Sequence, residues 1–275
     1  MNDENKTRQV GVVERFLDKI SARGIVSFSL QDILLSTGLS EIAARHQLLR
    51  LRERVIRVTP RQGFFLISSP EQRVFGAPPV DLWLNDYFTW LGSPYYLGLQ
   101  SAAAVHGSSP QAIQETQVIT DIPRDNILFS RIRINFFTKT NVSKSKIQQV
   151  QNAAAPLLVS TPETTALDLV RYANSIGGFE RAIETILPLI PLMRARPLRE
   201  TLEAEGELAS AQRLGYILTQ ADATNLAEII ADWLPKYKKN VPLALGLTIK
   251  HDAPVDKTYG VILNIQGDAN NAYKA

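Results

Sequence analysis

Residues 29–40 read SLQDILLSTGLS and residues 56–66 read IRVTPRQGFFL, with a helical pattern to Val55 between them. Gly38 can adopt the left-handed conformation that ends a helix, and Ser40 is a favourable N-cap for the helix that follows. The second stretch places a Pro-Arg-Gln-Gly turn between two β-rich runs, which is typical of a hairpin. This order of helix, tight turn, helix and hairpin predicts a winged helix-turn-helix.

The second helix of this motif has one apolar stripe and one polar face. The stripe repeats at helical spacing, so we expect it to pack on the two preceding helices; it consists of Ala44, Leu48, Leu51 and Val55. The opposite face carries Ile42, Ala43, His46, Arg50 and Glu53, with Gln47 and Arg54 on one flank.

Six arginines occur between residues 45 and 61, against the single acid Glu53; they are Arg45, Arg50, Arg52, Arg54, Arg57 and Arg61. A guanidinium group can fork onto a phosphate or onto guanine, whereas a lysine offers only a point charge. The pattern therefore predicts binding to double-stranded DNA. We expect phosphate contacts from Arg45, Arg52, Arg57 and Arg61, and approaches to base edges from Ala43, Gln47 and Arg50.

Composition excludes several other classes. The chain has 275 residues, 45% hydrophobic and 21% charged, with a formal net charge of +3. Since it has no cysteine, disulfides, thiolate zinc sites and cysteine nucleophiles are excluded. Glycine-rich nucleotide-binding motifs are absent and the three histidines lack metal-ligand spacing, so we expect no cofactor, no metal and no catalytic residue. A polar N-terminus and the lack of an apolar run of about 18 residues predict a cytoplasmic protein without a membrane partner.

The rest of the chain predicts an α+β protein in two domains. Proline and glycine between residues 68 and 79 indicate a linker, so we place the winged helix-turn-helix domain at residues 1–75 and a mixed α+β domain at residues 76–275. In the first domain we expect a helix at 10–22 and a short strand at 26–28. In the second, helices are expected at 82–90, within 95–107, and at 162–176, 179–187, 198–205, 209–219 and 224–233. Strands are expected at 116–120, 131–138, 157–159, 241–249 and 259–265.

Two stretches of the second domain carry a family resemblance. Residues 95–107 read YYLGLQSAAAVHG, and residues 160–172 read STPETTALDLVRY, followed by Gly177-Gly178. With the predicted winged helix in front, the chain resembles the AbiEi family, which are antitoxins and transcriptional regulators of bacterial type IV toxin–antitoxin (abortive infection) systems. The resemblance spans both domains, although neither stretch is a catalytic signature.

The resemblance implies a repressor that binds inverted repeats in the promoter of its own operon. It also implies a C-terminal domain that counteracts a nucleotidyltransferase-type toxin, without requiring a direct complex between the two proteins. The DNA-binding positions carried over from the family are Ser40, Ile42, Ala43, His46, Gln47, Arg50 and Arg54. No residue of an antitoxin site is carried over.

Other interpretations remain open at the level of sequence. Asp121 and Lys139 lie near adjacent predicted strands, as in a metal-dependent nuclease targeted by a winged helix, but no further nuclease motif accompanies them. The winged helix is alternatively a protein-interaction module. Glu163 and Asp168 are five residues apart on one helix, which favours separate structural roles over a catalytic pair, and His106 is expected to cap or pack. The basic runs at 144–146 and 236–239 receive no assigned role.

Overall fold

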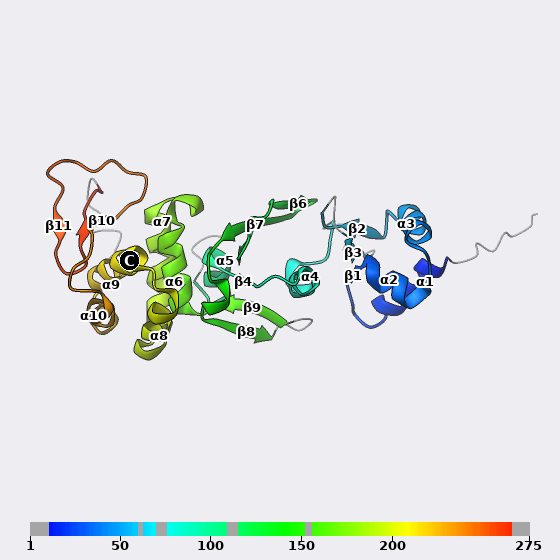
Figure 1. Ribbon diagram of the computed structural model, residues 1–275, viewed down its shortest axis with the longest axis horizontal. Coiled ribbons are helices and arrows are strands. Elements are labelled where there is room, and N and C mark those ends of the chain that lie inside the picture. The colour runs from blue at the N-terminus through cyan, green and yellow to red at the C-terminus, as the bar shows by residue number, and fades with distance from the viewer. Residues whose placement is uncertain (1–10, 60–62, 70–75, 109–114, 152–155, 266–275) are drawn as a thin grey trace, which may run out of the picture. The chain divides into compact units, whose positions relative to one another are not determined.

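The computed structural model describes residues 11–59, 63–69, 76–108, 115–151 and 156–265. These residues form ten α-helices and three β-sheets, so the predicted α+β class is confirmed (Figure 1). The chain divides into two compact units. Unit 1 contains residues 1–93, 126–134 and 151–157, and unit 2 contains residues 94–125, 135–150 and 158–275.

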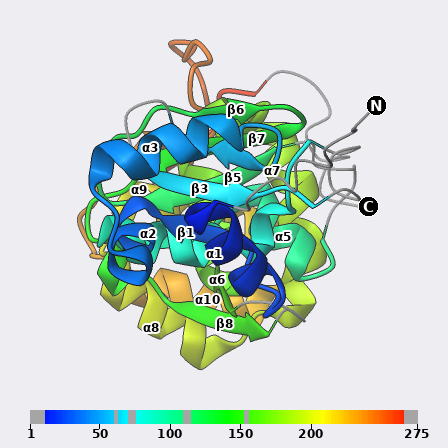
Figure 2. The same cartoon turned by 90° about the vertical axis from the view of Figure 1, so that its right-hand side faces the viewer.

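The first described elements of unit 1 are three helices and three strands. In chain order these are α1 (Val12–Ser21), β1 (Ser27–Ser29), α2 (Leu30–Thr37), α3 (Glu41–Arg50), β2 (Val55–Arg57) and β3 (Phe64–Ile67). The strands form an antiparallel sheet in the order β1-β3-β2, in which Phe65 lies opposite both Phe28 and Arg57. Figure 2 shows the three helices beside this sheet. The expected helix–turn–helix–hairpin sequence of elements is therefore present.

Local capping explains where these helices begin and end. Ser29 and Asp32 form a capping box at the start of α2, which the sequence analysis did not anticipate. As predicted, Gly38 ends α2 in the left-handed conformation, with φ of 68°, and Ser40 caps α3 by accepting a hydrogen bond from the amide of Ala43. These residues fix a tight turn between the two helices.

The core of unit 1 lies between the helices and the sheet. The four residues of the predicted stripe, Ala44, Leu48, Leu51 and Val55, all belong to this core. The helix expected to reach Val55 ends at Arg50, however, so Leu51 is its C-cap and Val55 begins strand β2. Phe28 and Phe65 stack in it with ring centroids 5.4 Å apart. One side of α3 is thus committed to the fold.

Unit 1 also includes α4 (Leu84–Leu91), which follows a 3₁₀ turn at Val80–Leu82. Phe64 of β3 meets the rings of Tyr87 and Trp90, and Ser27 donates a 2.7 Å hydrogen bond to Asp86. The contacts thus group α4 with the first elements, whereas the sequence placed residues 76–275 in a second domain. A domain boundary at residue 75 remains a prediction.

The largest sheet has six strands in the order β6-β7-β5-β4-β9-β8. These are β4 (Tyr95–Leu97), β5 (Thr116–Thr120), β6 (Ile127–Phe129), β7 (Ile132–Thr138), β8 (Ile147–Gln151) and β9 (Pro156–Ser160). The predictions of β5, β7 and β9 are confirmed, but β6 and β8 were missed. Residues 95–97 form strand β4, paired with β5 and β9, so the helix expected in this region begins only at Leu99.

Helices make up most of unit 2. They are α5 (Leu99–Val105), α6 (Pro162–Arg171), α7 (Phe179–Ile186), α8 (Ala195–Glu205), α9 (Leu208–Gln220) and α10 (Thr224–Trp233), with 3₁₀ turns at Val142–Lys144, Ala173–Ile176 and Leu187–Leu192. The predicted start of α6 is confirmed, because Thr161 is its N-cap and Pro162 opens its first turn. A small sheet closes this unit, with β10 (Val241–Pro242), β12 (Val261–Ile262) and β11 (Val255–Asp256) in that order. The strands expected at 241–249 and 259–265 are therefore much shorter than predicted.

Helix α6 lies in the centre of the unit 2 core. Its residues Ala166, Leu169 and Val170 are buried among side chains from α5, α7, α8 and α9. Among the described residues, the helices are too short or too polar to cross a membrane.

Candidate nucleic-acid interface and buried charged cluster

The outward side of α3 is open to solvent. Two large apolar residues on it, Ile42 and Leu49, expose 72% and 68% of their surface. His46 and Arg50 are also exposed, as is Arg52 in the turn after the helix. Among the described residues, neither Arg50 nor Arg52 forms an ion pair. This face therefore combines positive charge with apolar surface.

An open groove of about 340 Å³ lies between α3 and the hairpin strands. Its lining combines the apolar residues Leu48, Leu49, Val55 and Phe65 with the arginines Arg45, Arg52 and Arg57. The guanidinium of Arg57 lies over the ring of Phe65, 5.6 Å from its centroid. An apolar floor with cationic edges suits a ligand that carries both anionic and apolar groups.

Two of the predicted DNA-binding residues point elsewhere. The side-chain oxygen of Gln47 accepts a 3.0 Å hydrogen bond from the amide of Val13, in the first turn of α1. Arg54 forms ion pairs with Glu14 and Asp18 of α1, at 3.3 and 2.6 Å. Gln47 belongs to α3 and Arg54 to the turn after it, and both side chains contact α1. They hold α1 and are not directed to the outward face.

The remaining predicted residues stay compatible with an interface. Arg45 is half exposed and forms a 2.7 Å ion pair with Glu41, one turn earlier. Because exposed ion pairs are weak, a phosphate can replace Glu41 as the partner of Arg45. Ser40 acts as the helix cap and Ala43 is partly exposed. Arg61 lies outside the described residues.

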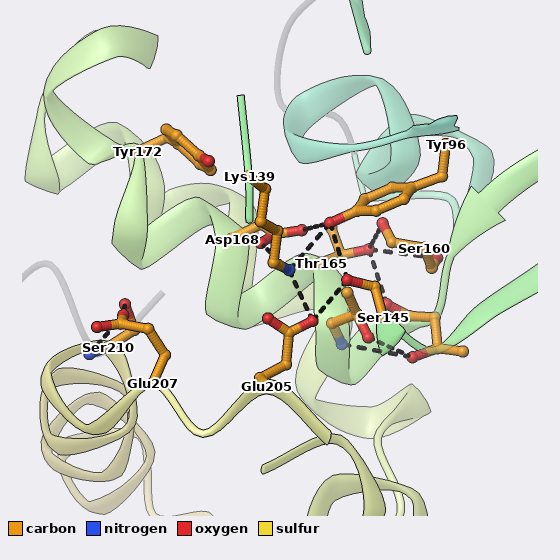
Figure 3. Close-up of polar contacts among 12 residues, drawn as sticks. Tyr96, Lys139, Ser145, Ser160, Thr165, Asp168, Tyr172, Glu205, Glu207 and Ser210 are labelled. Atoms are coloured by element: carbon orange, nitrogen blue, oxygen red, sulfur yellow. Dashed lines mark hydrogen bonds and ion pairs between the residues drawn. The ribbon is translucent and has the colours of Figure 1, made fainter. Parts of the chain in front are cut away.

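Unit 2 contains a buried cluster of charged side chains that the sequence analysis did not identify (Figure 3). The ammonium of Lys139 donates to Asp168 at 2.8 Å, to Glu205 at 2.6 Å and to the hydroxyl of Tyr96 at 3.0 Å. Tyr96 in turn donates to Asp168 at 2.8 Å, and Ser145 donates to Glu205 at 2.8 Å. All three ammonium protons of the lysine thus have an acceptor.

The cluster is sealed from solvent and joins distant parts of unit 2. Lys139 and Asp168 each expose about 1% of their side chain. Lys139 follows β7, Tyr96 belongs to β4, Asp168 to α6, and Glu205 is the last residue of α8. The network therefore ties two strands to two helices through hydrogen bonds that water would otherwise supply.

Burial shifts the pKa of two groups in the cluster, Asp168 and Tyr96. It disfavours the charged form of Asp168 and raises the pKa of that carboxyl, although Lys139 opposes the shift. Burial and the neighbouring carboxylate raise the pKa of Tyr96 well above its ordinary value, so Tyr96 stays a hydrogen-bond donor. With every polar group paired internally, this arrangement is suited to holding the fold.

The geometry separates the pairs considered for catalysis. Asp121 is exposed and accepts a hydrogen bond from Thr120, while Lys139 points into the buried cluster. Glu163 accepts a hydrogen bond from the amide of Arg194 and does not share a partner with Asp168, as the structural interpretation expected. Neither pair forms a joint site.

His106 has a hydrogen-bond partner, and the lysines of the two basic runs are mostly exposed. His106 follows the last residue of α5 and its Nε2 lies 2.8 Å from the carbonyl oxygen of Ser160, so the expected capping and packing role is confirmed. Lys144 and Lys146 are exposed, as are Lys236 and Lys239.

The structure was compared with known structures. It is similar to the crystal structure of the RV2827C protein from Mycobacterium tuberculosis, with a TM-score of 0.63 and 14% identity, covering 93% of this chain and 92% of that one. At this identity the similarity shows a shared fold only. A nucleotidyltransferase-like protein from Paracoccidioides brasiliensis matches with a TM-score of 0.37 and 10% identity, covering 59% of this chain and 94% of that one, which is too weak to support an argument. A search of curated proteins gave no match.

A comparison with protein families gives a match for one segment of the chain. Residues 96–220 match the family of the AbiEi antitoxin C-terminal domain. This segment runs from Tyr96 in β4 to the end of α9, and it includes all five residues of the buried cluster. Both sequence stretches on which the resemblance rested fall within it or at its edge. Residues 96–220 are therefore similar to the AbiEi antitoxin C-terminal domain.

Proposed function

We propose that the N-terminal elements of this protein form a winged helix-turn-helix that binds double-stranded DNA and represses the protein's own operon. The order α1-β1-α2-α3-β2-β3, with the sheet order β1-β3-β2, supports this assignment. In such a motif the second helix of the helix-turn-helix lies in the major groove and the hairpin lies beside the phosphate backbone. That helix is α3.

The single observation that carries the proposal is the arginine-bearing outward face of α3. The helix has 10 residues and is thus about 15 Å long, and the B-DNA major groove, about 12 Å wide, admits such a helix. Arg50 is the candidate for a forked contact with guanine. Arg45, Arg52 and Arg57 are candidates for phosphates, as is Arg61, which lies outside the described residues. Ser40, Ile42, Ala43 and His46 complete the face. Gln47 and Arg54 are left out because α1 engages both.

DNA binding is tested with a fluorescently labelled fragment of the promoter that contains the inverted repeats. Titration at several salt concentrations gives the dissociation constant and its salt slope. Arg45→Ala is expected to weaken binding to all sequences and to reduce the salt slope by about one phosphate contact. Arg50→Ala is expected to weaken specific binding by about 10- to 100-fold and to relax selectivity at one base.

Arg196→Ala is a matched control for Arg45→Ala. Arg196 pairs with Glu200 one turn away on an exposed helix surface, as Arg45 pairs with Glu41. The control removes the same charge and the same kind of pair from unit 2. If all three variants bound the promoter fragment as the unaltered protein does, the proposed interface would be wrong.

We further propose that the chain counteracts a nucleotidyltransferase-type toxin. The support is the family of the matched domain. The proposal does not require a stable complex of the two proteins. Induced expression of the nucleotidyltransferase from an adjacent reading frame should stop growth, and co-expression of this chain from a promoter that it does not control should restore it. Continued growth arrest would reject the antitoxin role for that toxin.

A further inference from the structure

Ile42 and Leu49 are not used by the fold of unit 1. They are the two large apolar residues of α3 that face solvent, while Ala44 and Leu48 on its other side are buried in the core. Exposing both side chains loses the free energy that burial of apolar surface would supply. Their exposure therefore requires an explanation outside the fold.

Their spacing places them in one row along the helix. Seven residues make nearly two helical turns, so Ile42 and Leu49 lie on the same side, about 10 Å apart along the axis. Arg45 and His46 lie between them at the positions three and four residues after Ile42, where they share that side. The base pairs of B-DNA are about 3.4 Å apart, so the two apolar residues are separated by about three base pairs.

Charge identifies the occupant of this row. Arg45 and Arg52 line the same groove as Leu49, and the exposed Arg50 follows Leu49 in the chain, so a second copy of the same face would bring these like charges together. Duplex DNA supplies phosphates for the arginines instead. On the major-groove edge of the bases it presents one apolar group, the C5-methyl group of thymine.

The geometry points to Ile42 and Leu49 as residues that recognise thymine, each through its C5-methyl group. We propose that a half-site of the operator has thymines at two positions about three base pairs apart, one contacted by each residue. This inference rests on the proposed DNA binding and specifies its sequence choice. Leu49 also borders the groove beside Val55 and Phe65, so a methyl group there is removed from water on several sides.

The test replaces single thymines of the promoter fragment by deoxyuridine, which removes the methyl group and leaves the hydrogen-bonding groups of the base. Binding of the unaltered protein is expected to weaken about four-fold at each of two positions, as for the loss of one buried methyl group. The Leu49→Ala variant should be insensitive to the replacement at one position, and Ile42→Ala at the other. Phosphate contacts, and hence the salt slope, should be unchanged in both variants.

Leu35→Ala is the matched control, because Leu35 of α2 is also an exposed leucine of unit 1, at 83%, but is not on α3. It should keep the sensitivity of the unaltered protein at both positions. Circular dichroism verifies that each variant is folded, which the exposure of the three residues leads us to expect.

The outcomes separate this inference from the proposed function. Tight, salt-sensitive promoter binding that ignores deoxyuridine at every position would overturn thymine recognition and leave DNA binding intact. Retained sensitivity of both Leu49→Ala and Ile42→Ala at both positions would do the same. A fall in self-association for these variants, measured by sedimentation, with no change in deoxyuridine sensitivity would assign the row to a protein interface. Absence of promoter binding by the unaltered protein would overturn both proposals.

Discussion

At the scale of single residues, Lys139 is the position with the largest expected effect on stability. Its ammonium is the sole cation among the five side chains of the cluster and contacts both buried carboxylates. Lys139→Met keeps the length of the side chain but leaves Asp168 and Glu205 buried without a counter-charge. We expect the free energy of unfolding to fall by about 3–5 kcal/mol, as measured by urea denaturation.

Arg196→Met tests whether such a loss is specific to burial. It breaks the 2.9 Å ion pair between Arg196 and Glu200, which is similar in length to the ion pairs of Lys139. The side chain of Arg196, however, is 90% exposed. Exposed pairs contribute little, so the change should stay below about 1 kcal/mol. Equal effects of Lys139→Met and Arg196→Met would show that the cluster does not hold the fold.

The carboxyl of Asp168 predicts a particular dependence of stability on pH. Burial raises its pKa in the folded protein above the ordinary value of 3.8, with Lys139 opposing the shift. The folded protein then keeps this proton to a higher pH than the unfolded chain does. The stability contributed by this group is therefore greatest below the ordinary pKa and declines as the pH rises through the raised one.

The measurement compares unaltered protein with Asp168→Asn, which cannot titrate at this position. The free energy of unfolding of the unaltered protein minus that of the variant should decrease as the pH rises from the ordinary pKa of 3.8 through the raised one. Asp252→Asn, which removes an exposed carboxyl, corrects for the change in net charge. An increase with pH would mean that Lys139 outweighs burial and that the pKa of Asp168 is lowered.

Sequence reasoning could not have found this cluster. Lys139 and Asp168 are 29 residues apart, and Lys139 and Glu205 are 66 apart, so no local spacing relates them. Gln47 and Arg54 illustrate the same difficulty in unit 1. Helical periodicity placed Gln47 on a flank of α3, whereas Arg54 lies in the turn after that helix, and periodicity carries no information about which element contacts either residue. By contrast, the caps formed by Ser40 and Thr161 depend on neighbours within three residues, and both were predicted correctly.

At the scale of elements, the turn between α2 and α3 depends on the conformation of Gly38. Its φ is 68°, and a Cβ added there meets no atom within 4 Å, so the cost of a substitution is conformational and not steric. Gly38→Ala should lower the free energy of unfolding by about 1 kcal/mol. Gly38→Asn should cost less, because asparagine tolerates the left-handed region. Equal thermal denaturation curves for the alanine variant and the unaltered protein would contradict this account.

Elements were predicted well where the pattern is local and poorly where pairing is distant. The amphipathic helices α6 to α10 and the alternating strand β7 repeat their own periodicity, which fixes their type. Strand β4 has three residues ahead of an alanine-rich helix, and its partners β5 and β9 come much later in the chain. Its strand conformation arises from those partners, since Tyr95, Tyr96 and Leu97 are all buried in the sheet. The short strands β6 and β8 were also missed, although their neighbours in the sheet, β7 and β9, are the next strands along the chain.

At the scale of the whole molecule, the two proposed activities fall on different segments. The proposed DNA-reading face belongs to unit 1, whereas unit 2 contains most of the residues that match the AbiEi antitoxin C-terminal domain. Each unit has its own core, one built around α1 to α3 and the other around α6. We therefore expect substitutions on the exposed face of α3 to leave the fold of the matched domain unchanged.

The double variant Arg45→Ala/Arg50→Ala tests whether the activities are separable. It removes two exposed arginines from α3 without touching a core residue, so it should fold and fail to repress a reporter under the operon promoter. Expressed from an unrelated promoter, it should still restore growth to cells that express the toxin. Arg196→Ala/Arg199→Ala lowers the net charge equally, at two exposed arginines of α8, and should still repress the reporter. If the folded α3 variant lost both repression and growth rescue, the antitoxin effect would depend on DNA binding. The two activities would then not be separable.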